Sequence, residues 1–253
     1  MASAYHDNQA SRNLLHFLDN KTAKMEFGID CLGALYFPDT HLVNIAESCR
    51  LLADHPGIEV INREAPNEVN FVACASGSKR FTSTEELEIG DIAGQLDFIG
   101  IPDSSPLKKD TLVHGSGYVI QSSTEWLIGS TYEQRPWSPA AALEFNIEKN
   151  RKFLGNSPVH SRGNFRAHRC VSSDRDPVIG QLNKGQYFSA AHGSMGTISS
   201  PFAAELVVSQ FLGLLPPLSK SGLATVAPDR FRNRQKKRGV KRIGESSYTE
   251  VIL

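Results

Sequence analysis

Residues 186–211 read QYFSAAHGSMGTISSPFAAELVVSQF, and this stretch decides the fold. Its first six residues, 186–191, are mostly apolar or small and predict a buried strand. The two glycines within 192–196 predict a tight turn, because residues without a Cβ tolerate backbone conformations that other residues avoid. Ser200-Pro201 then predicts the start of a helix over 202–211, since proline is favoured in the first helical turn. A strand, a tight turn and a helix in this order are typical of α/β proteins.

The turn has the features of a ligand site. The start of a helix presents free N–H groups and the positive end of the helix dipole. Glycine also lets a ligand approach the backbone closely. Such a place suits a phosphate group or the edge of an electron-rich ring. A glycine turn that only packs a strand against a helix gives the same pattern, so the motif alone leaves both interpretations open.

The rest of the chain mixes predicted helices and strands. Apolar residues at helical spacing predict helices over 43–52 and 139–153. Apolar runs bounded by Gly, Pro or Ser predict strands over 58–61, 69–75, 92–99, 117–122 and 126–131. We expect the last three strands to form an antiparallel sheet, with a hairpin near Thr124-Glu125. The fold class is therefore predicted to be α/β (α+β).

The composition is that of an ordinary soluble globular protein, with 40% hydrophobic and 21% charged residues among 253. The formal net charge is zero, but eight Lys or Arg residues and no acid lie between Arg230 and Arg242. The four cysteines lack C-x-x-C spacing and nearby histidines, so we expect free thiols in a reducing cytoplasm and no metal site; they are Cys31, Cys49, Cys74 and Cys170. We expect neither a signal peptide nor a membrane span, because no apolar run is long enough.

A second segment, residues 169–180, reads RCVSSDRDPVIG and ends 12 residues before His192. An arginine, D-x-P-V-I-G, a strand, a G-S-x-G turn and an S-P helix start follow one another here. This series resembles the C-terminal FAD-binding segment of the D-amino-acid-oxidase-like flavoproteins, which include glycine and sarcosine oxidases. Within that group it is most similar to the oxidoreductase half of the bifunctional tRNA 5-methylaminomethyl-2-thiouridine biosynthesis proteins.

Shorter pieces of the chain resemble other motifs of the same family in the same order. They are the G-x-L-Y-x-P run at 33–38, the strand end at 72–77, the A-G-Q segment at 92–96, the G-Y pair at 117–118, the strand at 128–132 and the A-P-D-R-F run at 223–234. The resemblance therefore covers about residues 33–238.

The resemblance implies FAD as cofactor, held partly by a Rossmann-like FAD/NAD(P)-binding domain. Backbone N–H groups of the turn would approach the flavin ring; the residues are Gly193, Ser194, Met195 and Gly196. Arg169 would lie beside the ring or bind a substrate carboxylate through two N–H groups, which makes it both a catalytic and a cofactor-binding residue. A structural ion pair of Arg169 with Asp174 or Asp176 is the alternative.

Three further site residues follow from the same resemblance. Gly94 and Gln95 would line the substrate side, Gly94 as a cofactor contact and Gln95 as a catalytic residue. Gly77 would contact the cofactor at the end of its strand. Tyr118 fits the core better than a catalytic role.

The activity implied is oxidation of a secondary amine at the carbon next to nitrogen. For the tRNA-modifying relatives the substrate is carboxymethylaminomethyl-uridine at the wobble position, and hydrolysis of the resulting imine leaves aminomethyl-uridine. A small-molecule amine oxidase of the glycine or sarcosine type is one alternative, and a non-catalytic remnant that binds RNA is another. A tRNA partner would contact the basic run; the residues are Arg230, Arg232, Arg234, Lys236, Lys237 and Arg238.

The sequence departs from the family pattern at three points. It holds no G-x-G-x-x-G, the motif that seats the FAD pyrophosphate, and no methyltransferase motif, so both segments are expected as missing partners. Met195 stands where close relatives carry arginine. The predicted domains are a partial FAD-binding domain over 1–90, an antiparallel substrate domain over 91–165, a C-terminal FAD-binding segment over 166–215 and a basic tail over 216–253. We expect the chain to be less ordered after Pro228.

Overall fold

The computed structural model describes residues 14–61, 72–74 and 87–239. The chain divides into two compact units. The first unit comprises residues 1–60 and 93–167, and the second comprises residues 61–92 and 168–253. Each unit has a hydrophobic core of its own.

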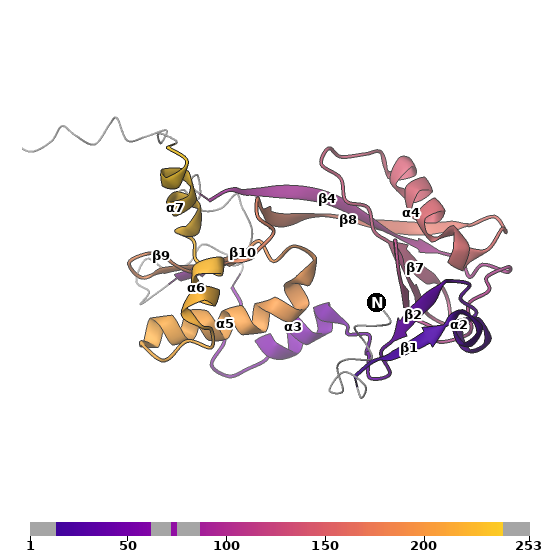
Figure 1. The fold of residues 1–253 in the computed structure, drawn as a ribbon, viewed down its shortest axis with the longest axis horizontal. Coiled ribbons are helices and arrows are strands. Elements are labelled where there is room, and N and C mark those ends of the chain that lie inside the picture. The colour runs from indigo at the N-terminus through magenta and orange to yellow at the C-terminus, as the bar shows by residue number, and fades with distance from the viewer. Residues whose placement is uncertain (1–13, 62–71, 75–86, 240–253) are drawn as a thin grey trace, which may run out of the picture. The chain divides into compact units, whose positions relative to one another are not determined.

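A five-stranded sheet with the strand order β5-β6-β7-β4-β8 forms the centre of the first unit (Figure 1). Its strands are β4 (Ile89–Ile99), β5 (Val113–His114), β6 (Tyr118–Gln121), β7 (Trp126–Gly129) and β8 (Ser161–Ser172). Strand β7 pairs antiparallel with both β4 and β6, so Gly129 lies opposite Leu96 on one side and Tyr118 on the other. The antiparallel sheet predicted from the sequence is confirmed. The two longest strands, β4 and β8, continue into the second unit.

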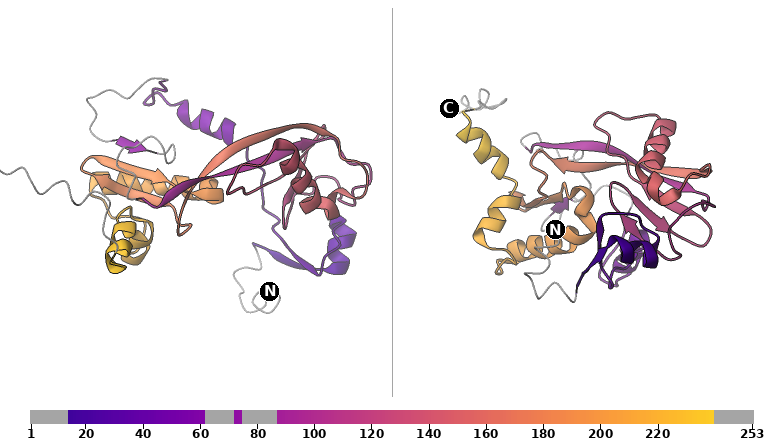
Figure 2. Two further views of the ribbon diagram at one scale, coloured as in Figure 1. Left: turned by 90° about the horizontal axis from the view of Figure 1, so that it is seen from above. Right: turned by 45° about the vertical axis from the view of Figure 1, so that its right-hand side comes forward.

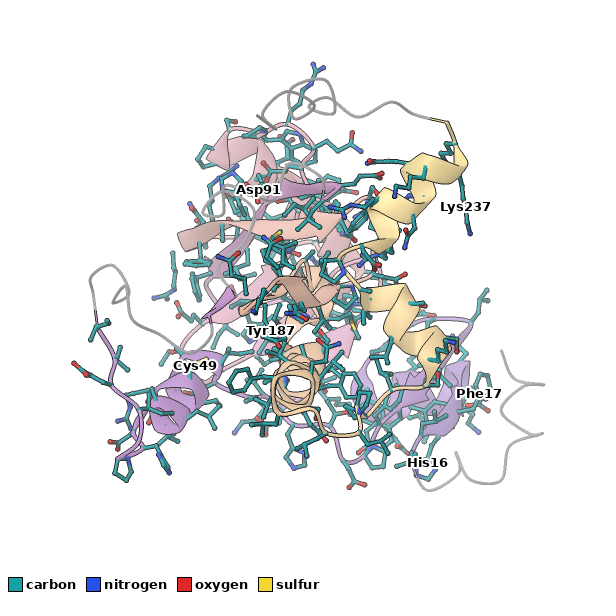
Figure 3. The ribbon with its side chains drawn as sticks, turned by 90° about the vertical axis from the view of Figure 1, so that its left-hand side faces the viewer. His16, Phe17, Cys49, Asp91, Tyr187 and Lys237 are labelled. Carbon is teal, nitrogen blue, oxygen red and sulfur yellow. The ribbon has the colours of Figure 1, made fainter. Side chains whose placement is uncertain are left out.

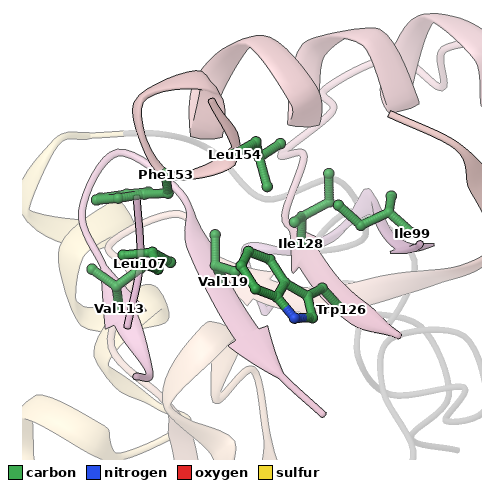
Figure 4. Close-up of a cluster of buried hydrophobic side chains, with 8 residues drawn as sticks. All are labelled: Ile99, Leu107, Val113, Val119, Trp126, Ile128, Phe153 and Leu154. Carbon is green, nitrogen blue, oxygen red and sulfur yellow. The ribbon is translucent and has the colours of Figure 1, made fainter. Parts of the chain in front are cut away.

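Helix α4 (Pro139–Leu154) covers one face of this sheet and buries its core (Figure 4). The Ser138 side chain accepts a hydrogen bond of 3.2 Å from the Ala141 amide, and Pro139 occupies the first helical position. Side chains alternate along a strand, so Val119 and Ile128 face the helix and are fully buried. The helix predicted over 139–153 is confirmed.

The first unit also contains a hairpin-like β–α–β element. It consists of β1 (His16–Asp19), α2 (Asn20–Phe27) and β2 (Gly33–Tyr36), with β1 and β2 antiparallel. Gly28 ends α2 with φ at 74°, and a Cβ there would lie 1.7 Å from the Pro106 carbonyl oxygen. Only Ala23 of α2 is buried, so the helix lacks the periodically spaced apolar residues from which a helix is predicted. The sequence therefore did not predict β1 and α2.

Helix α3 (Ile45–Ala53) confirms the helix predicted over 43–52. Its N-terminus is capped by Asn44, whose side chain accepts a hydrogen bond from the Glu47 amide at 3.1 Å. The strand predicted over 58–61 is wrong. These residues have no regular structure, and Ile58 and Val60 are 53% and 76% exposed. A strand requires a hydrogen-bonded neighbour, and residues 58–61 have none within the described part of the chain.

The second unit is built on a three-stranded sheet with the order β3-β10-β9. The strands are β3 (Val72–Cys74), β9 (Val178–Asn183) and β10 (Gln186–Ala190). Strand β10 runs parallel to β3 and antiparallel to β9. The strand predicted over 186–191 is confirmed. Of the strand predicted over 69–75, residues 72–74 are confirmed, and the others lie outside the described residues.

Helix α5 (Gly196–Leu212) lies along β9 and β10, preceded by the single turn η2 (Gly193–Met195) (Figures 1 and 2). Ala203 and Leu206 of the helix pack against Tyr187, which lies beside α5 in Figure 3. The helix was predicted to start at 202, which is wrong, because it begins six residues earlier. Pro201 therefore lies inside α5, where it has no N–H to donate to the carbonyl four residues back.

The chain continues into two short helices, α6 (Lys220–Val226) and α7 (Arg230–Lys237). Phe231 anchors α7, because its fully buried ring packs in one cluster with Val178 and Phe188. The expectation of a less ordered tail is thus wrong for residues 230–237. The Phe231 side chain thus attaches α7 to the core of the second unit, although the other residues of this helix are strongly polar.

Candidate functional site

The glycine turn follows β10 directly and is open at the surface of the second unit. Gly193 has φ at 57°, a conformation that glycine adopts without strain. The Met195 amide donates to the His192 carbonyl at 3.0 Å. Gly193 and Ser194 are the first residues of the turn. The helix that follows therefore contains no carbonyl that could accept a hydrogen bond from their amides. Ser194 is exposed and Met195 is 55% exposed, so neighbouring side chains leave this end of the helix accessible.

His192 holds the turn in place, a role that no motif in the sequence predicts. Its Nδ1 lies 2.8 Å from Ser199 Oγ, and its Nε2 lies 3.2 Å from Ser189 Oγ. The Ser199 hydroxyl donates to the Met195 carbonyl at 2.9 Å, so it accepts from a protonated Nδ1, and Nε2 accepts from Ser189. Burial lowers the pKa of His192, which favours this neutral imidazole. The ring thereby connects the end of β10 to the first turns of α5.

Arg169 lies near the end of β8, half-buried, on the same strand as Val171. Residues two apart in a strand share a face, and Val171 forms a bridge with His192. Its Cγ1 lies 3.9 Å from the position of a Cβ built on Gly193. The structure therefore places Arg169 on the side of β8 that borders the glycine turn.

Gly94 and Gln95 are neighbours in β4, so their side-chain positions point to opposite faces of the sheet. Gln95 faces α4 and is 1% exposed. Its Nε2 donates to Asp97 Oδ1 at 2.7 Å and to the Pro139 carbonyl at 3.0 Å. The Cα hydrogens of Gly94 therefore belong to the face of the sheet opposite the Gln95 side chain.

The Gln95 side chain belongs to a buried polar network on the α4 face. Asn146 of α4 donates to Asp97 Oδ2 at 2.8 Å and to the Gln95 carbonyl at 3.1 Å. Burial raises the pKa of Asp97 despite the hydrogen bonds that Asn146 and Gln95 donate to its carboxylate. The network ties α4 to β4 through side chains that cannot exchange these bonds for water.

Arg166 of β8 completes this network, and no pattern in the sequence predicts this role. Its guanidinium donates to Gln95 Oε1 at 2.7 Å and to Glu133 Oε2 at 2.8 Å. Burial raises the pKa of Glu133, but hydrogen bonds from Thr131 and the Trp137 amide, with the charge of Arg166, outweigh burial and lower it below its usual value. Glu133 is therefore an ionised carboxylate with 1% exposure.

The face of the sheet opposite α4 is lined by Gly94, Leu96, Tyr118 and Gly129. The last three form one row across β4, β7 and β6. A Cβ built on Gly129 would lie 2.6 Å from the Tyr118 hydroxyl, so the tyrosine lies directly over the glycine. Tyr118 is half-buried on this face and is absent from the hydrophobic core beneath α4.

Helix α7 is held to the end of β8 by ion pairs. Arg230 donates to both Asp174 carboxylate oxygens, at 3.0 and 2.9 Å, and is 10% exposed. Arg234 pairs with Asp174 at 3.2 Å and also with Glu88. Burial raises the pKa of Asp174, but the hydrogen bonds, chiefly from Arg230, outweigh it and hold the pKa at about 2. These contacts correct the predicted RNA surface, because the charges of Arg230 and Arg234 are used within the protein.

The remaining basic side chains of this region are exposed; they are Arg232, Lys236, Lys237 and Arg238. Lys237 marks the C-terminal end of α7 in Figure 3. The predicted cofactor contact Gly77 lies outside the described residues. Within the described ranges, no three His, Cys, Asp or Glu side chains are grouped to hold a metal ion. None of the described helices has both the length and the apolar character to cross a membrane.

Comparison with known proteins identifies a consistent group of relatives. No protein-family model matches the chain. The chain is 26% identical to the tRNA 5-methylaminomethyl-2-thiouridine biosynthesis bifunctional protein MnmC of Ectopseudomonas mendocina, over 94% of this chain and 45% of that protein. It is also 26% identical to the protein of the same name from Pseudomonas fluorescens, over 90% of this chain and 44% of that protein. The chain thus spans about half the length of the curated relatives it matches.

Two solved structures share the fold. Iminodiacetate oxidase from Chelativorans sp. BNC1 matches with a TM-score of 0.71 and 16% identity, over 90% of this chain and 72% of that chain. Glycine oxidase from Geobacillus kaustophilus matches with a TM-score of 0.68 and 16% identity, over 90% of this chain and 71% of that chain. The α/β fold class and the family resemblance predicted from the sequence are confirmed.

Proposed function

We propose that this chain is part of an FAD-dependent oxidoreductase that acts on the C–N bond of a secondary amine. One observation carries the proposal: the glycine turn at the start of α5 is exposed and lies beside the strand end that bears Arg169. The named relatives and the amine oxidase fold support the same activity.

The glycine turn fits the flavin ring. The Gly193 and Ser194 amides stand at the positive end of the α5 dipole, which stabilises negative charge. At Gly193, van der Waals contact with Val171 is the only crowding that a Cβ would meet among the described residues, so a planar ring can approach the backbone. Met195 and Gly196 would border the same edge. When bound, FAD would accept a hydride equivalent from the carbon next to the amine nitrogen.

Arg169 is the residue we propose for the substrate carboxylate. A guanidinium binds both oxygens of a carboxylate in one plane, which suits a carboxymethyl group on an amine. Gln95 lies on the α4 face of its strand and is 1% exposed. We infer that Gln95 acts by holding β4 and Arg166 in place, while Gly94 lies buried on the opposite face of the sheet. The predicted contact of Gly77 with the cofactor stays part of this proposal.

The substrate we propose is carboxymethylaminomethyl-uridine at the wobble position of tRNA. Oxidation of the carboxymethyl carbon gives an imine, and water then releases glyoxylate and leaves aminomethyl-uridine. The relatives named for tRNA 5-methylaminomethyl-2-thiouridine biosynthesis support this substrate. A tRNA substrate implies a cytoplasmic protein. Two of the expected partners are a segment with the G-x-G-x-x-G motif and a methyltransferase. Both would be supplied by a sequence other than this one.

The exposed cations of α7 and the residue after it are proposed to contact the tRNA backbone. Replacing Lys236, Lys237 and Arg238 by Gln should weaken binding of a wobble-modified anticodon stem-loop and reduce the slope of log affinity against log salt by about 2. Filter binding at several salt concentrations measures this slope. A triple variant of exposed lysines elsewhere serves as the control; its residues are Lys108, Lys109 and Lys184. Equal slopes for both triple variants would exclude α7 from the RNA surface.

The activity is tested on the full chain combined with the G-x-G-x-x-G segment of the Ectopseudomonas mendocina relative. We expect a yellow complex that removes the carboxymethyl group from the modified stem-loop, measured by mass spectrometry of the digested RNA. Arg169→Gln should raise KM at least about 100-fold, whereas Arg162→Gln, on an exposed position of the same strand, should not. Turnover of sarcosine but not RNA would favour a small-molecule oxidase, and a colourless mixture that still binds RNA would favour a non-catalytic remnant.

A further inference from the structure

Two aromatic side chains at the start of helix α4 are exposed although they contact each other. Trp137 directly precedes the helix cap and is 38% exposed, and Phe145 lies in the second turn of the helix and is 41% exposed. Their ring centroids are 5.1 Å apart in an edge-to-face arrangement with an interplanar angle of 71°. Neither ring belongs to the hydrophobic core beneath α4. We call Trp137 and Phe145 the aromatic pair.

The backbone around Trp137 is held firmly in place. Its amide donates a hydrogen bond of 2.8 Å to Glu133 Oε2, and Glu133 is a buried side chain. Pro136 restricts the backbone on one side of Trp137, and Ser138 on the other side caps α4. An aromatic surface that is fixed in advance loses little conformational freedom when a flat ligand stacks on it.

Two cations accompany the aromatic pair. Lys149 lies one helical turn after Phe145, and its Nζ is 5.4 Å from the centre of the Phe145 ring. The same Nζ donates to the Ser130 carbonyl at 3.3 Å, which orients the ammonium group. Arg135 is exposed two residues before Trp137. Among the described residues neither Lys149 nor Arg135 pairs with a carboxylate, so both charges are available to an anion.

The charge of this region favours an anionic partner. Residues 135–152 include four Lys or Arg and two Glu, which gives a net charge of +2. Glu148 lies next to Phe145 on the helix surface, but Arg151 is 3.8 Å from its carboxylate and compensates the charge. Aromatic rings beside cations are typical of surfaces that bind single-stranded nucleic acids, where the rings stack bases and the cations contact phosphates.

A protein partner fits the aromatic pair less well. The centre of a protein interface is a continuous apolar surface from which charged residues are depleted. Between residues 133 and 154, all of which the structure describes, Trp137 and Phe145 are the only exposed large apolar side chains. Two rings bordered by cations give flat stacking surfaces without the surrounding apolar area that a protein contact requires.

We propose that the aromatic pair stacks on an unpaired base of the RNA, with Lys149 and Arg135 contacting the adjoining phosphates, an inference that rests on the proposed tRNA substrate. Every base has a π-face, so the pair contributes affinity without a sequence preference. Bases in a loop can be unstacked and presented to an aromatic side chain, whereas bases in a duplex cannot. The pair therefore distinguishes the loop of an RNA from its stem.

The test uses Trp137 as its own fluorescent reporter. The chain contains two tryptophans, and the other one, Trp126, is 6% exposed in the core beneath α4 (Figure 4). The full chain, without flavin, is titrated with an unmodified anticodon stem-loop and with a blunt RNA duplex of equal length. We expect the stem-loop to quench the tryptophan fluorescence and the duplex to leave it unchanged, because only the loop offers a base for stacking.

Filter binding of variants measures the contribution of the stacked base. Trp137→Ala, and Phe145→Leu, which keeps an apolar side chain against Trp137, should each weaken binding of the stem-loop about 5- to 150-fold. Trp137→Phe keeps an aromatic ring and should retain most of the affinity. Lys149→Gln should reduce the slope of log affinity against log salt by about 1. Phe165→Ala, at a 59% exposed aromatic residue of β8, should leave the affinity unchanged.

Four results overturn the inference. They are equal quenching by the duplex, no binding of the stem-loop at low salt, wild-type affinity in both Trp137→Ala and Phe145→Leu, and self-association of the chain that Trp137→Ala abolishes in sedimentation. The last result would make the aromatic pair a protein interface.

The failure of this inference is distinguishable from failure of the proposed function. A chain that binds the stem-loop through the aromatic pair, but shows no FAD-dependent activity when the G-x-G-x-x-G segment is supplied, contradicts the proposed function alone. An active enzyme whose KM for the modified stem-loop is unchanged by Trp137→Ala contradicts only the stacking of the base.

Discussion

The ion pairs between Asp174 and α7 lead to a quantitative prediction for Asp174→Asn. This substitution keeps the shape of the side chain but removes the charge that Arg230 and Arg234 bind. Arg230 is only 10% exposed, so its guanidinium would be left with a nearly buried, uncompensated charge. Removing one member of a buried ion pair usually destabilises a protein by more than the intact pair stabilises it, because the other charge stays buried without a partner.

The magnitude follows from the pKa of Asp174. Its fall from 3.8 to about 2 corresponds to roughly 2.5 kcal/mol of folding free energy. The carboxylate side chain is 21% exposed, so this value needs little reduction for solvent screening. Glu88 still neutralises part of the charge of Arg234. We therefore expect Asp174→Asn to lower the free energy of unfolding by about 2 to 3 kcal/mol near neutral pH.

The effect must depend on pH in a defined direction. A carboxylate with a lowered pKa in the folded state stabilises fully above its unfolded pKa of 3.8. That stabilisation is lost as the pH falls through the folded pKa of about 2. The difference in unfolding free energy between wild type and Asp174→Asn should therefore be constant above pH of about 5 and shrink below 4.

Urea unfolding followed by circular dichroism, at a series of pH values, measures this difference. Asp176→Asn is the matched control, because the Asp176 carbonyl that accepts from Arg230 and Ser172 is retained. The reasoning is refuted if Asp174→Asn costs less than about 0.5 kcal/mol at neutral pH. A cost that persists unchanged into acid would equally show that the charge of Asp174 is not its source.

Four further predictions follow from the packing. Gly28→Ala should lower the free energy of unfolding by at least about 3 kcal/mol, because the added Cβ would lie 1.7 Å from the Pro106 carbonyl oxygen. Gly90→Ala, where a Cβ would meet no atom within 4 Å, should change the melting temperature little. Arg166→Met should cost about 3 to 5 kcal/mol by stranding the buried Glu133, and adding Glu133→Gln should recover most of the loss in urea unfolding. Phe231→Ala should cost about 3 to 5 kcal/mol as a cavity in a full core, whereas Phe165→Ala, at 59% exposure, should not. Burial lowers the pKa of His192 from its unfolded value of 6.5, so the free energy of unfolding is highest above that value and falls as the pH drops below it. His192→Asn should flatten this slope in urea unfolding at a series of pH values.

Local patterns in the sequence predicted several elements correctly because their causes are local. Strand 186–191 and helix 139–153 follow from apolar spacing, and the start of α4 follows from Ser138 and Pro139. The start of α5 was misplaced, because Ser200-Pro201 imitates a helix start while the true start at Gly196 follows from the turn held by His192. The sequence thus contains two possible helix starts, and tertiary packing selects the one at Gly196.

The ionic groups show the opposite case. Arg230 and Arg234 look like the exposed cations beside them in sequence, yet they pair with Asp174 more than 50 residues away. Arg166 carried no signal at all, because its partners are Gln95 of β4 and Glu133 of the segment after β7, both distant from it in the sequence. Assigning a charge to a ligand or to the protein interior requires knowing which side chains the fold brings within hydrogen-bonding distance.

The sequence by itself determined the class of fold, the strand–turn–helix unit and the family resemblance, since short-range periodicity and glycine and proline positions are properties of adjacent residues. The tertiary structure alone decided that Gln95 is buried beneath α4, that His192 fixes the glycine turn, and that two of the predicted RNA-binding arginines hold α7 to the protein. The physical reason is that a side chain's role depends on burial and on partners distant in the chain, and both are set only when the strands and helices have packed.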